Sequence, residues 1–251
     1  MQLQFAMDVS TLDEALVLCR QVAEHVDILE IGSPLIKNEG VTAIRAITAS
    51  YPDKTIFADM KTVDAGELEA DMAFSAGADL VSVMGGADDD TVRGAVAAAR
   101  RRGKGVVADM TDVRGCVLRA RELAGLGVEF CELHAGTAEQ ALCRYSVRAV
   151  IEAGRQSEAP FSVAGGVDLD SILDVRASGA VVAVVGDAIR GAPDPRAAAG
   201  AFRLAVDTAS LFGDVTSVRQ GRPHGIPCGP GPGPGPWRAR RARLADRAPN
   251  V

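Results

Sequence analysis

Short apolar runs alternate with amphipathic stretches along residues 1–212 of the chain. Eight of these runs are typical of buried strands: LQFAM, VDILEI, TIFA, DLVSVM, GVVA, VEFCEL, FSVA and VVAVV. Between them, stretches such as TLDEALVLCRQVAEHV carry apolar residues at helical spacing. Continuous apolar strands separated by helices predict a parallel sheet that is covered on both faces.

A regular spacing of the strand ends selects one kind of parallel sheet. The polar or glycine residues that close the eight runs are Asp8, Glu30, Asp59, Ser82, Asp109, His134, Gly165 and Gly186. Their intervals of 22, 29, 23, 27, 25, 31 and 21 residues fit a compact (β/α)8 TIM barrel, in which all strand ends meet at one mouth. An open doubly wound sheet is the alternative, but the first unit lacks the G-x-G-x-x-G turn of its dinucleotide-binding members.

The composition changes sharply after residue 212. Residues 213–251 contain Gly-Pro repeats followed by an arginine cluster, with seven Arg against two Asp and hence a net charge of +5. Because the whole chain carries −6, residues 1–212 carry −11. We therefore expect a barrel domain at 1–212 and a disordered basic tail at 213–251. The tail could attract an anionic partner, but only Trp237 offers a stacking surface, so nucleic-acid binding is not expected.

The sequence gives no sign of a membrane or secretory route. No apolar stretch approaches the ~20 residues that cross a bilayer, and the N-terminus MQLQFAMDVS does not resemble a signal peptide. Five scattered cysteines form no C-x-x-C pair, which argues against a zinc site and a disulfide framework. We expect a cytoplasmic protein with reduced cysteines.

An unusual group of charges lies at the predicted mouth. The segment FADMKTVDAG places Asp59, Lys61 and Asp64 directly behind a strand, while Asp8 and Glu30 close neighbouring strands. Each aspartate alone would be an ordinary helix N-cap. Together, four carboxylates around one lysine are unfavourable unless a cation or a substrate compensates them. A divalent metal between Glu30 and Asp59 is one solution, and the Lys61 ammonium is another.

Glycines close the last two strands. SVAGGVD supplies Gly165 and Gly166, and VVGDAI supplies Gly186. Exposed backbone N–H groups after the last two strands of a barrel can hold a phosphate. Tight turns that require glycine are the alternative explanation.

Several long motifs carry a resemblance to a known family. EIGSPLIKNEG, ADMKTVDAGE, ELHAGTAEQA, SVAGGVD and VVGDAIRGAPDP resemble the 3-hexulose-6-phosphate synthase family of the orotidine 5'-monophosphate decarboxylase superfamily, with its D-x-K-x-x-D motif. The resemblance covers residues 2–210. It implies a homodimeric barrel that uses Mg2+ to condense ribulose 5-phosphate with formaldehyde, with Asp64 reaching into the partner's active site.

The resemblance also implies catalytic roles for Asp8, Asp59, Lys61, Asp64 and His134. Removing a C1 proton from the ketose leaves an enediolate that a metal on Glu30 and Asp59 and the Lys61 ammonium would stabilise. His134 is the expected proton carrier, because an ordinary histidine pKa of ~6.5 lies near working pH. A histidine that merely forms hydrogen bonds at a strand end is the alternative.

Two other functions stay open at this point. The sister decarboxylase of 3-keto-L-gulonate 6-phosphate shares the scaffold, but it carries an arginine where this chain has Thr137. A catalytically inactive barrel that binds partners through its basic tail is the second alternative. The chain departs from the family at Asp187, which places a carboxylate beside the expected phosphate site, where we expect it to turn away and cap its helix.

Overall fold

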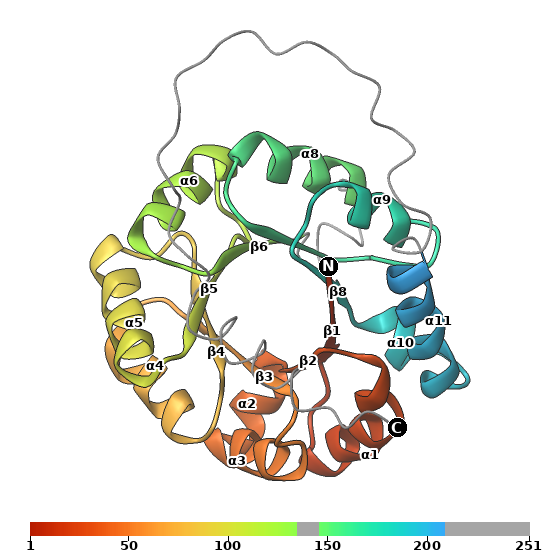
Figure 1. The fold of residues 1–251 in the computed structure, drawn as a ribbon. Coiled ribbons are helices and arrows are strands. Elements are labelled where there is room, and N and C mark those ends of the chain that lie inside the picture. Colours follow the sequence, from red (N-terminus) through yellow and green to blue (C-terminus); the bar gives the residue numbers. More distant parts are fainter. Residues whose placement is uncertain (135–145, 209–251) are drawn as a thin grey trace, which may run out of the picture.

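The computed structural model describes residues 1–134 and 146–208, which form a closed barrel of eight parallel strands (Figure 1). The strands are β1 (Gln2–Met7), β2 (Ile28–Ile31), β3 (Thr55–Thr62), β4 (Leu80–Met84), β5 (Gly105–Asp109), β6 (Phe130–His134), β7 (Phe161–Ala164) and β8 (Val182–Val185). Each strand pairs with the next, and β8 closes the ring by pairing with β1. The predicted (β/α)8 barrel is confirmed. The tail at 213–251 lies outside the described residues.

Helices surround the sheet in the order of the sequence (Figure 1). They are α1 (Leu12–Val22), η1 (Ala23–His25), α2 (Ser33–Glu39), α3 (Val41–Ser50), α4 (Gly66–Ser75), α5 (Asp89–Arg102), α6 (Cys116–Leu126), α8 (Val147–Ser157), α9 (Ile172–Ala177), α10 (Asp187–Arg190) and α11 (Pro195–Thr208). The strands are buried on both faces, because helices cover the outside and side chains fill the inside. In the described part of the chain, no helix has the length and apolarity that a membrane span requires.

The barrel interior is filled by two kinds of side chain. One cluster of inward-facing side chains is apolar: Ala6, Ile28, Phe57, Leu80, Val107, Phe130, Ala164, Val182 and Val184. Because side chains alternate along a strand, the next inward position on β2, β3, β5 and β6 lies two residues towards the carboxyl end. Those positions hold Glu30, Asp59, Asp109 and Glu132, all buried. On these four strands the interior therefore changes from an apolar level to an acidic level towards the carboxyl ends.

Strand β3 departs from the expected boundary. We expected it to end at Asp59, but it continues to Thr62 through a register shift against β4 between Ala58 and Thr62. Lys61 adopts a left-handed backbone with φ of 47°, which is uncommon for a residue other than glycine. Its backbone N–H donates to Ser82 Oγ at 2.8 Å, which supports this conformation. An irregularity of this kind redirects side chains, and here it falls on the D-x-K segment.

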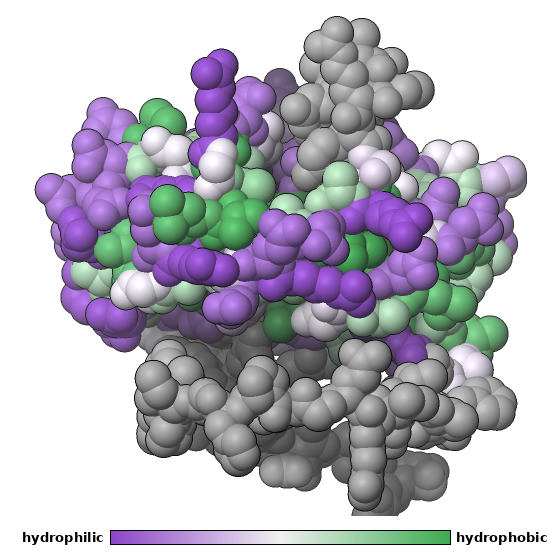
Figure 2. Space-filling model, turned by 90° about the horizontal axis from the view of Figure 1, so that it is seen from above, coloured by the Kyte–Doolittle hydropathy of each residue, from purple (hydrophilic) through white to green (hydrophobic). Residues whose placement is uncertain are grey.

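Hydrophilic side chains predominate on the outer face that Figure 2 shows, and the hydrophobic ones form separate small patches. Among the described residues, the exposed large hydrophobic side chains include Val63, Leu68 and Met72, which follow β3 or lie on α4.

Candidate active site

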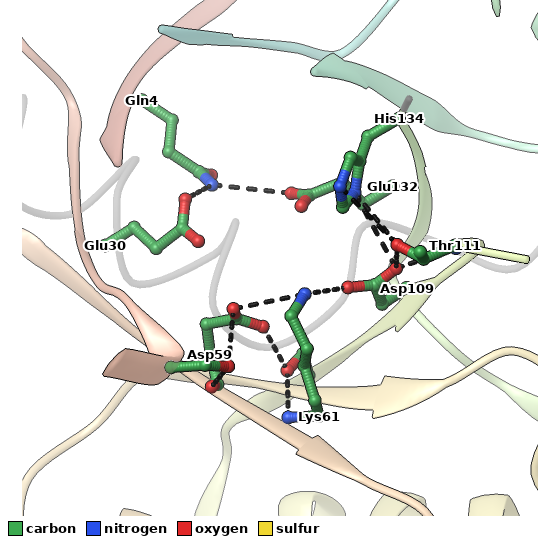
Figure 3. Close-up of polar contacts among 10 residues, drawn as sticks. Gln4, Glu30, Asp59, Lys61, Asp109, Thr111, Glu132 and His134 are labelled. Carbon is green, nitrogen blue, oxygen red and sulfur yellow. Dashed lines mark hydrogen bonds and ion pairs between the residues drawn. The ribbon is translucent and has the colours of Figure 1, made fainter. Parts of the chain in front are cut away.

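Polar side chains from five strands converge inside the mouth of the barrel (Figure 3). They come from β1, β2, β3, β5 and β6, and the close-up labels Gln4, Glu30, Asp59, Lys61, Asp109, Glu132 and His134, together with Thr111 just after β5. The structure thus brings together Glu30, Asp59, Lys61 and His134 as the strand-end pattern predicted. Gln4, Asp109, Thr111 and Glu132 were not among the predicted site residues.

Lys61 lies between two carboxylates. Its Nζ is 3.2 Å from Asp59 Oδ2 and forms a close ion pair with Asp109 Oδ2. Burial alone would lower the pKa of Lys61, but the attraction of Asp59 and Asp109 outweighs it and leaves the pKa above its ordinary value. Lys61 is therefore a fixed positive charge and not a base. Of the four carboxylates expected around this lysine, Asp59 pairs with it, and within this chain the second partner is Asp109.

Asp59 is held by donors on both carboxylate oxygens. Ser82 Oγ donates to Oδ1 at 2.7 Å, and Ser33 Oγ lies 2.9 Å from Oδ2. Ser82 also accepts the backbone N–H of Lys61, so one serine ties both charged residues of β3 to β4. These contacts fix Asp59 before any ligand arrives, which is the arrangement expected for a preorganised site.

Two buried glutamates share one amide. Gln4 Nε2 donates to Glu30 Oε2 at 2.7 Å and lies 3.5 Å from Glu132 Oε2. Burial, followed by the neighbouring carboxylates, raises the pKa of Glu30 well above its ordinary value and that of Glu132 to about 8. Among the described residues, the buried Gln4 Oε1 has no hydrogen-bond partner. Among the described residues, Lys61 forms its ion pairs with Asp59 and Asp109 and none with Glu30 or Glu132, so the two glutamates are incompletely compensated (Figure 3).

That deficit fits a hard divalent cation. Oxygen ligands are the ones Mg2+ prefers, and Glu30, Asp59 and the free amide oxygen of Gln4 are all oxygen donors. A second group, Asp109, Glu132 and His134, has one ligand atom from each residue within 4.8 Å of the others. Its imidazole nitrogen suits Mg2+ less well. The donor chemistry therefore favours the Glu30 side.

The remaining predicted acids lie at the rim. Asp8 follows β1 and is open to solvent, yet partial burial of its carboxyl, followed by the nearby Asp59, raises its pKa. A Cβ at Gly32 would lie 2.7 Å from the backbone oxygen of Met7 and 2.5 Å from Asp8 Oδ1, and because the backbone cannot move aside, glycine is required here. Asp64 is exposed, and it precedes α4 by two residues instead of beginning it. Its role in a partner's site stays a prediction.

The glycine turns occupy the ends of two adjacent strands. Gly165 and Gly166 follow β7 with φ of 81° and 77°, conformations that favour glycine, and Gly186 follows β8. The expectation that Asp187 caps its helix is wrong: Gly186 is the N-cap residue of α10, and no side chain caps that helix. Asp187 instead forms an ion pair with Arg190, with its side chain 85% exposed. Its charge is therefore neutralised by Arg190. Thr137 lies outside the described residues.

Known proteins resemble this chain over most of its length. Residues 1–202 match the model of the orotidine 5'-phosphate decarboxylase / HUMPS family, and the chain belongs to this family. A 3-hexulose-6-phosphate synthase from Mycobacterium gastri is 52% identical over 82% of this chain and 100% of its own length. A second synthase, from Methylomonas aminofaciens, is 39% identical over 78% of this chain and 94% of its own. The crystal structure of a Salmonella typhimurium synthase superposes with a TM-score of 0.78 at 38% identity, covering 82% of this chain and 98% of that one.

These relatives confirm the family that the motifs indicated. They also confirm that the protein is an enzyme of the aldehyde-lyase class, of 3-hexulose-6-phosphate synthase type.

Proposed function

We propose that this enzyme condenses D-ribulose 5-phosphate with formaldehyde to give 3-hexulose 6-phosphate. The observation that carries the proposal is the Lys61 ammonium fixed between Asp59 and Asp109 inside a ring of buried carboxylates. Such a site offers positive charge where an electron-rich sugar intermediate would form. The names of the similar synthases support the same reaction.

The chemistry requires one proton to leave and one to return. His134 takes a proton from C1 of the ketose, and the electron pair of that bond forms the enediolate. The C1 carbon then attacks the formaldehyde carbon, the C=O electron pair moves to oxygen, and the new alkoxide takes up a proton. Lys61 keeps its proton throughout and stabilises the negative charge by its position.

Glu30 and Asp59 would hold Mg2+ at this mouth. The buried, poorly compensated carboxylates and the free oxygen of Gln4 fit this role. A bound cation would add positive charge beside the oxygens of the reacting sugar. Gly165, Gly166 and Gly186 would receive the phosphate through backbone N–H groups, and Asp187 would border that phosphate site while Arg190 offsets its charge.

A turnover assay tests the proposal. Purified protein with Mg2+, ribulose 5-phosphate and formaldehyde should consume formaldehyde and form a hexulose phosphate. Lys61→Ala should abolish this activity, while Lys37→Ala, at an exposed lysine, should retain it. No formaldehyde loss, together with CO2 release from 3-keto-L-gulonate 6-phosphate, would establish the sister decarboxylase activity instead.

We also propose that the enzyme is a homodimer whose active sites share Asp64. The exposed Asp64 adjoins the exposed apolar residues Val63, Leu68 and Met72, which would be covered by a second copy. Mixing the inactive variants Lys61→Ala and Asp64→Ala should restore partial activity, because some mixed dimers contain one intact site. No recovery after verified subunit exchange would show that Asp64 does not act in the partner's active site.

A further inference from the structure

A bulge in β3 lies opposite a single residue of β4. Ala58 pairs with Val81, and the next pair joins Thr62 to Val83. Three residues of β3 therefore stand opposite one residue of β4, Ser82, and these three form the D-M-K part of the D-x-K motif. Where a bulge interrupts the ladder, the extra residues lose their regular partners and the side chains are redirected. The geometry of the motif therefore depends on the contacts that hold this bulge.

The Ser82 hydroxyl contacts both ends of the bulge. Its Oγ lies 2.7 Å from Asp59 Oδ1 and 2.8 Å from the backbone nitrogen of Lys61. A backbone N–H can only donate, so the serine oxygen accepts from Lys61 and its one hydroxyl proton remains for the Asp59 carboxylate. The Ser82 residue is 1% exposed, so water has little access to compete for these two hydrogen bonds.

The Lys61 backbone needs such support. Its φ of 47° lies in the left-handed region, which is unfavourable for a residue other than glycine and persists only where the surroundings hold it. The bond from the Lys61 N–H to Ser82 Oγ takes the place of the ladder bond that the bulge removes. In this conformation the Lys61 ammonium reaches both Asp59 and Asp109 (Figure 3).

We infer that Ser82 is a positioning residue, which holds Lys61 in its left-handed conformation and Asp59 against the Lys61 ammonium. Ser82 acts through these two residues. For the reaction, the inference rests on the proposed function, in which the Lys61 charge must lie where the enediolate forms. A β3 strand that relaxed to a regular extended backbone would move this charge. Loss of the Ser82 hydroxyl should therefore lower kcat, and KM should change less, because the phosphate is expected to bind at the ends of β7 and β8.

NMR of lysine-labelled protein measures the Lys61 backbone without any turnover. The chain has four lysines, so the Lys61 signals of full-length protein can be assigned by comparison with Lys61→Ala. The Cα and Cβ shifts depend on φ and ψ, and wild-type Lys61 should show the values of a left-handed residue. Ser82→Ala should move these shifts towards those of an extended strand. Ser82→Cys keeps nearly the same size but offers only a weak donor and acceptor, so it should act in the same way and carries the test if Ser82→Ala does not fold.

Three further variants show whether the Ser82 hydroxyl itself is responsible. Ser82→Thr keeps a hydroxyl and should retain the wild-type Lys61 shifts. Ser50→Ala, at an exposed serine that ends α3, should not change them. Ser33→Ala should also leave them unchanged, because the Ser33 hydroxyl lies against Asp59 whereas the Lys61 N–H bonds to Ser82. A change in Ser33→Ala as large as that in Ser82→Ala would show that Asp59 fixes the Lys61 backbone, and this result would overturn the inference.

Kinetics separate the inference from the proposed function. In an active enzyme, kcat should fall about 10- to 100-fold in Ser82→Ala, since a small displacement of a catalytic group costs factors of this size, and Ser82→Thr should keep most of the wild-type kcat. Unchanged Lys61 shifts or an unchanged kcat in Ser82→Ala would overturn the inference while leaving the synthase assignment intact. An inactive wild-type protein whose Lys61 shifts still change in Ser82→Ala would overturn the proposed function alone.

Discussion

The two levels of the barrel interior perform opposite tasks with side chains only two residues apart. On β3, Phe57 is 1% exposed and packs among apolar residues, whereas Asp59 is 5% exposed and accepts hydrogen bonds from two serines. The apolar level, which we call the lower level, gains stability by burying apolar surface. The acidic level, which we call the upper level, carries several carboxylates close together with one lysine, an arrangement that burial makes unfavourable. One level therefore stabilises the fold, and the other holds the charges that the chemistry needs.

Removing Lys61 should give the largest effect on the upper level. Lys61→Ala should lower kcat/KM by on the order of 10^3-fold or more, equivalent to about 4 kcal/mol, because the enediolate loses its fixed positive charge. Steady-state assays of formaldehyde consumption measure this loss. Circular dichroism should show a folded protein, and activity within tenfold of wild type would contradict the assigned role.

Truncating the lower level should affect stability and not chemistry. Phe57→Ala should lower the free energy of unfolding by about 3 kcal/mol, because it leaves a cavity in a fully packed interior. Urea denaturation measures the change, and Leu204→Ala, at a side chain that is 67% exposed, is the control with little effect. A stability loss below about 1 kcal/mol would show that this level does not carry the fold.

Metal binding should stabilise the upper level through Glu30. Saturating Mg2+ at about 100 times Kd should raise the free energy of unfolding by about 2.7 kcal/mol, and Glu30→Gln should remove most of this gain. Thermal-shift measurements with and without Mg2+ detect this stabilisation independently of activity. Glu122→Gln, at an exposed glutamate, should behave as wild type. If Mg2+ stabilised Glu30→Gln as much as wild type, the metal would have to bind at another site.

The stability of the upper level should depend on pH through Glu132. Burial raises its pKa to about 8 from 4.5, so the folded state binds more protons than the unfolded state between these values. Stability is therefore lost as pH rises from 4.5 to 8. Glu132→Gln should reduce this loss by more than about 1 kcal/mol, since one pKa unit corresponds to ~1.4 kcal/mol. Denaturation at pH 4.5 and pH 8 measures this loss of stability, and an equal loss in wild type and Glu132→Gln would contradict the burial argument.

The smallest effect is expected at Asp187. Because its side chain is exposed and paired with Arg190, Asp187→Ala should change KM for ribulose 5-phosphate by less than about threefold, as for other exposed ion pairs. Arg190→Ala would leave the carboxylate uncompensated and should raise KM more. A large fall in KM for Asp187→Ala would show that the carboxylate repels the phosphate.

The barrel could be predicted from the sequence because each strand carries two signals, an apolar run and a polar or glycine end. Marking only the last residue of each run found Asp59 and His134 but overlooked Glu132 and Gln4. These residues face inward in phase with the marked ones, two or more positions earlier, so alternation along the strand was an available signal. Asp109 closed a strand and was marked, but nothing in the sequence showed that it pairs with Lys61.

Other features depended on three-dimensional contacts that no local pattern contains. The register shift of β3 coincides with the hydrogen bond between Lys61 and Ser82, two residues on different strands. Asp187 prefers the Arg190 guanidinium to the cap of its own helix, a competition that spacing alone could not decide.

Exchange of the C1 proton of ribulose 5-phosphate in D2O, followed by proton NMR without formaldehyde, tests most directly whether the acidic level generates an enediolate. Wild-type enzyme with Mg2+ should introduce deuterium at C1 at least about 10^2-fold faster than Lys61→Ala, and Phe57→Ala that remains folded should exchange at nearly the wild-type rate. Absence of exchange in a folded wild-type enzyme that binds the sugar phosphate would contradict the account.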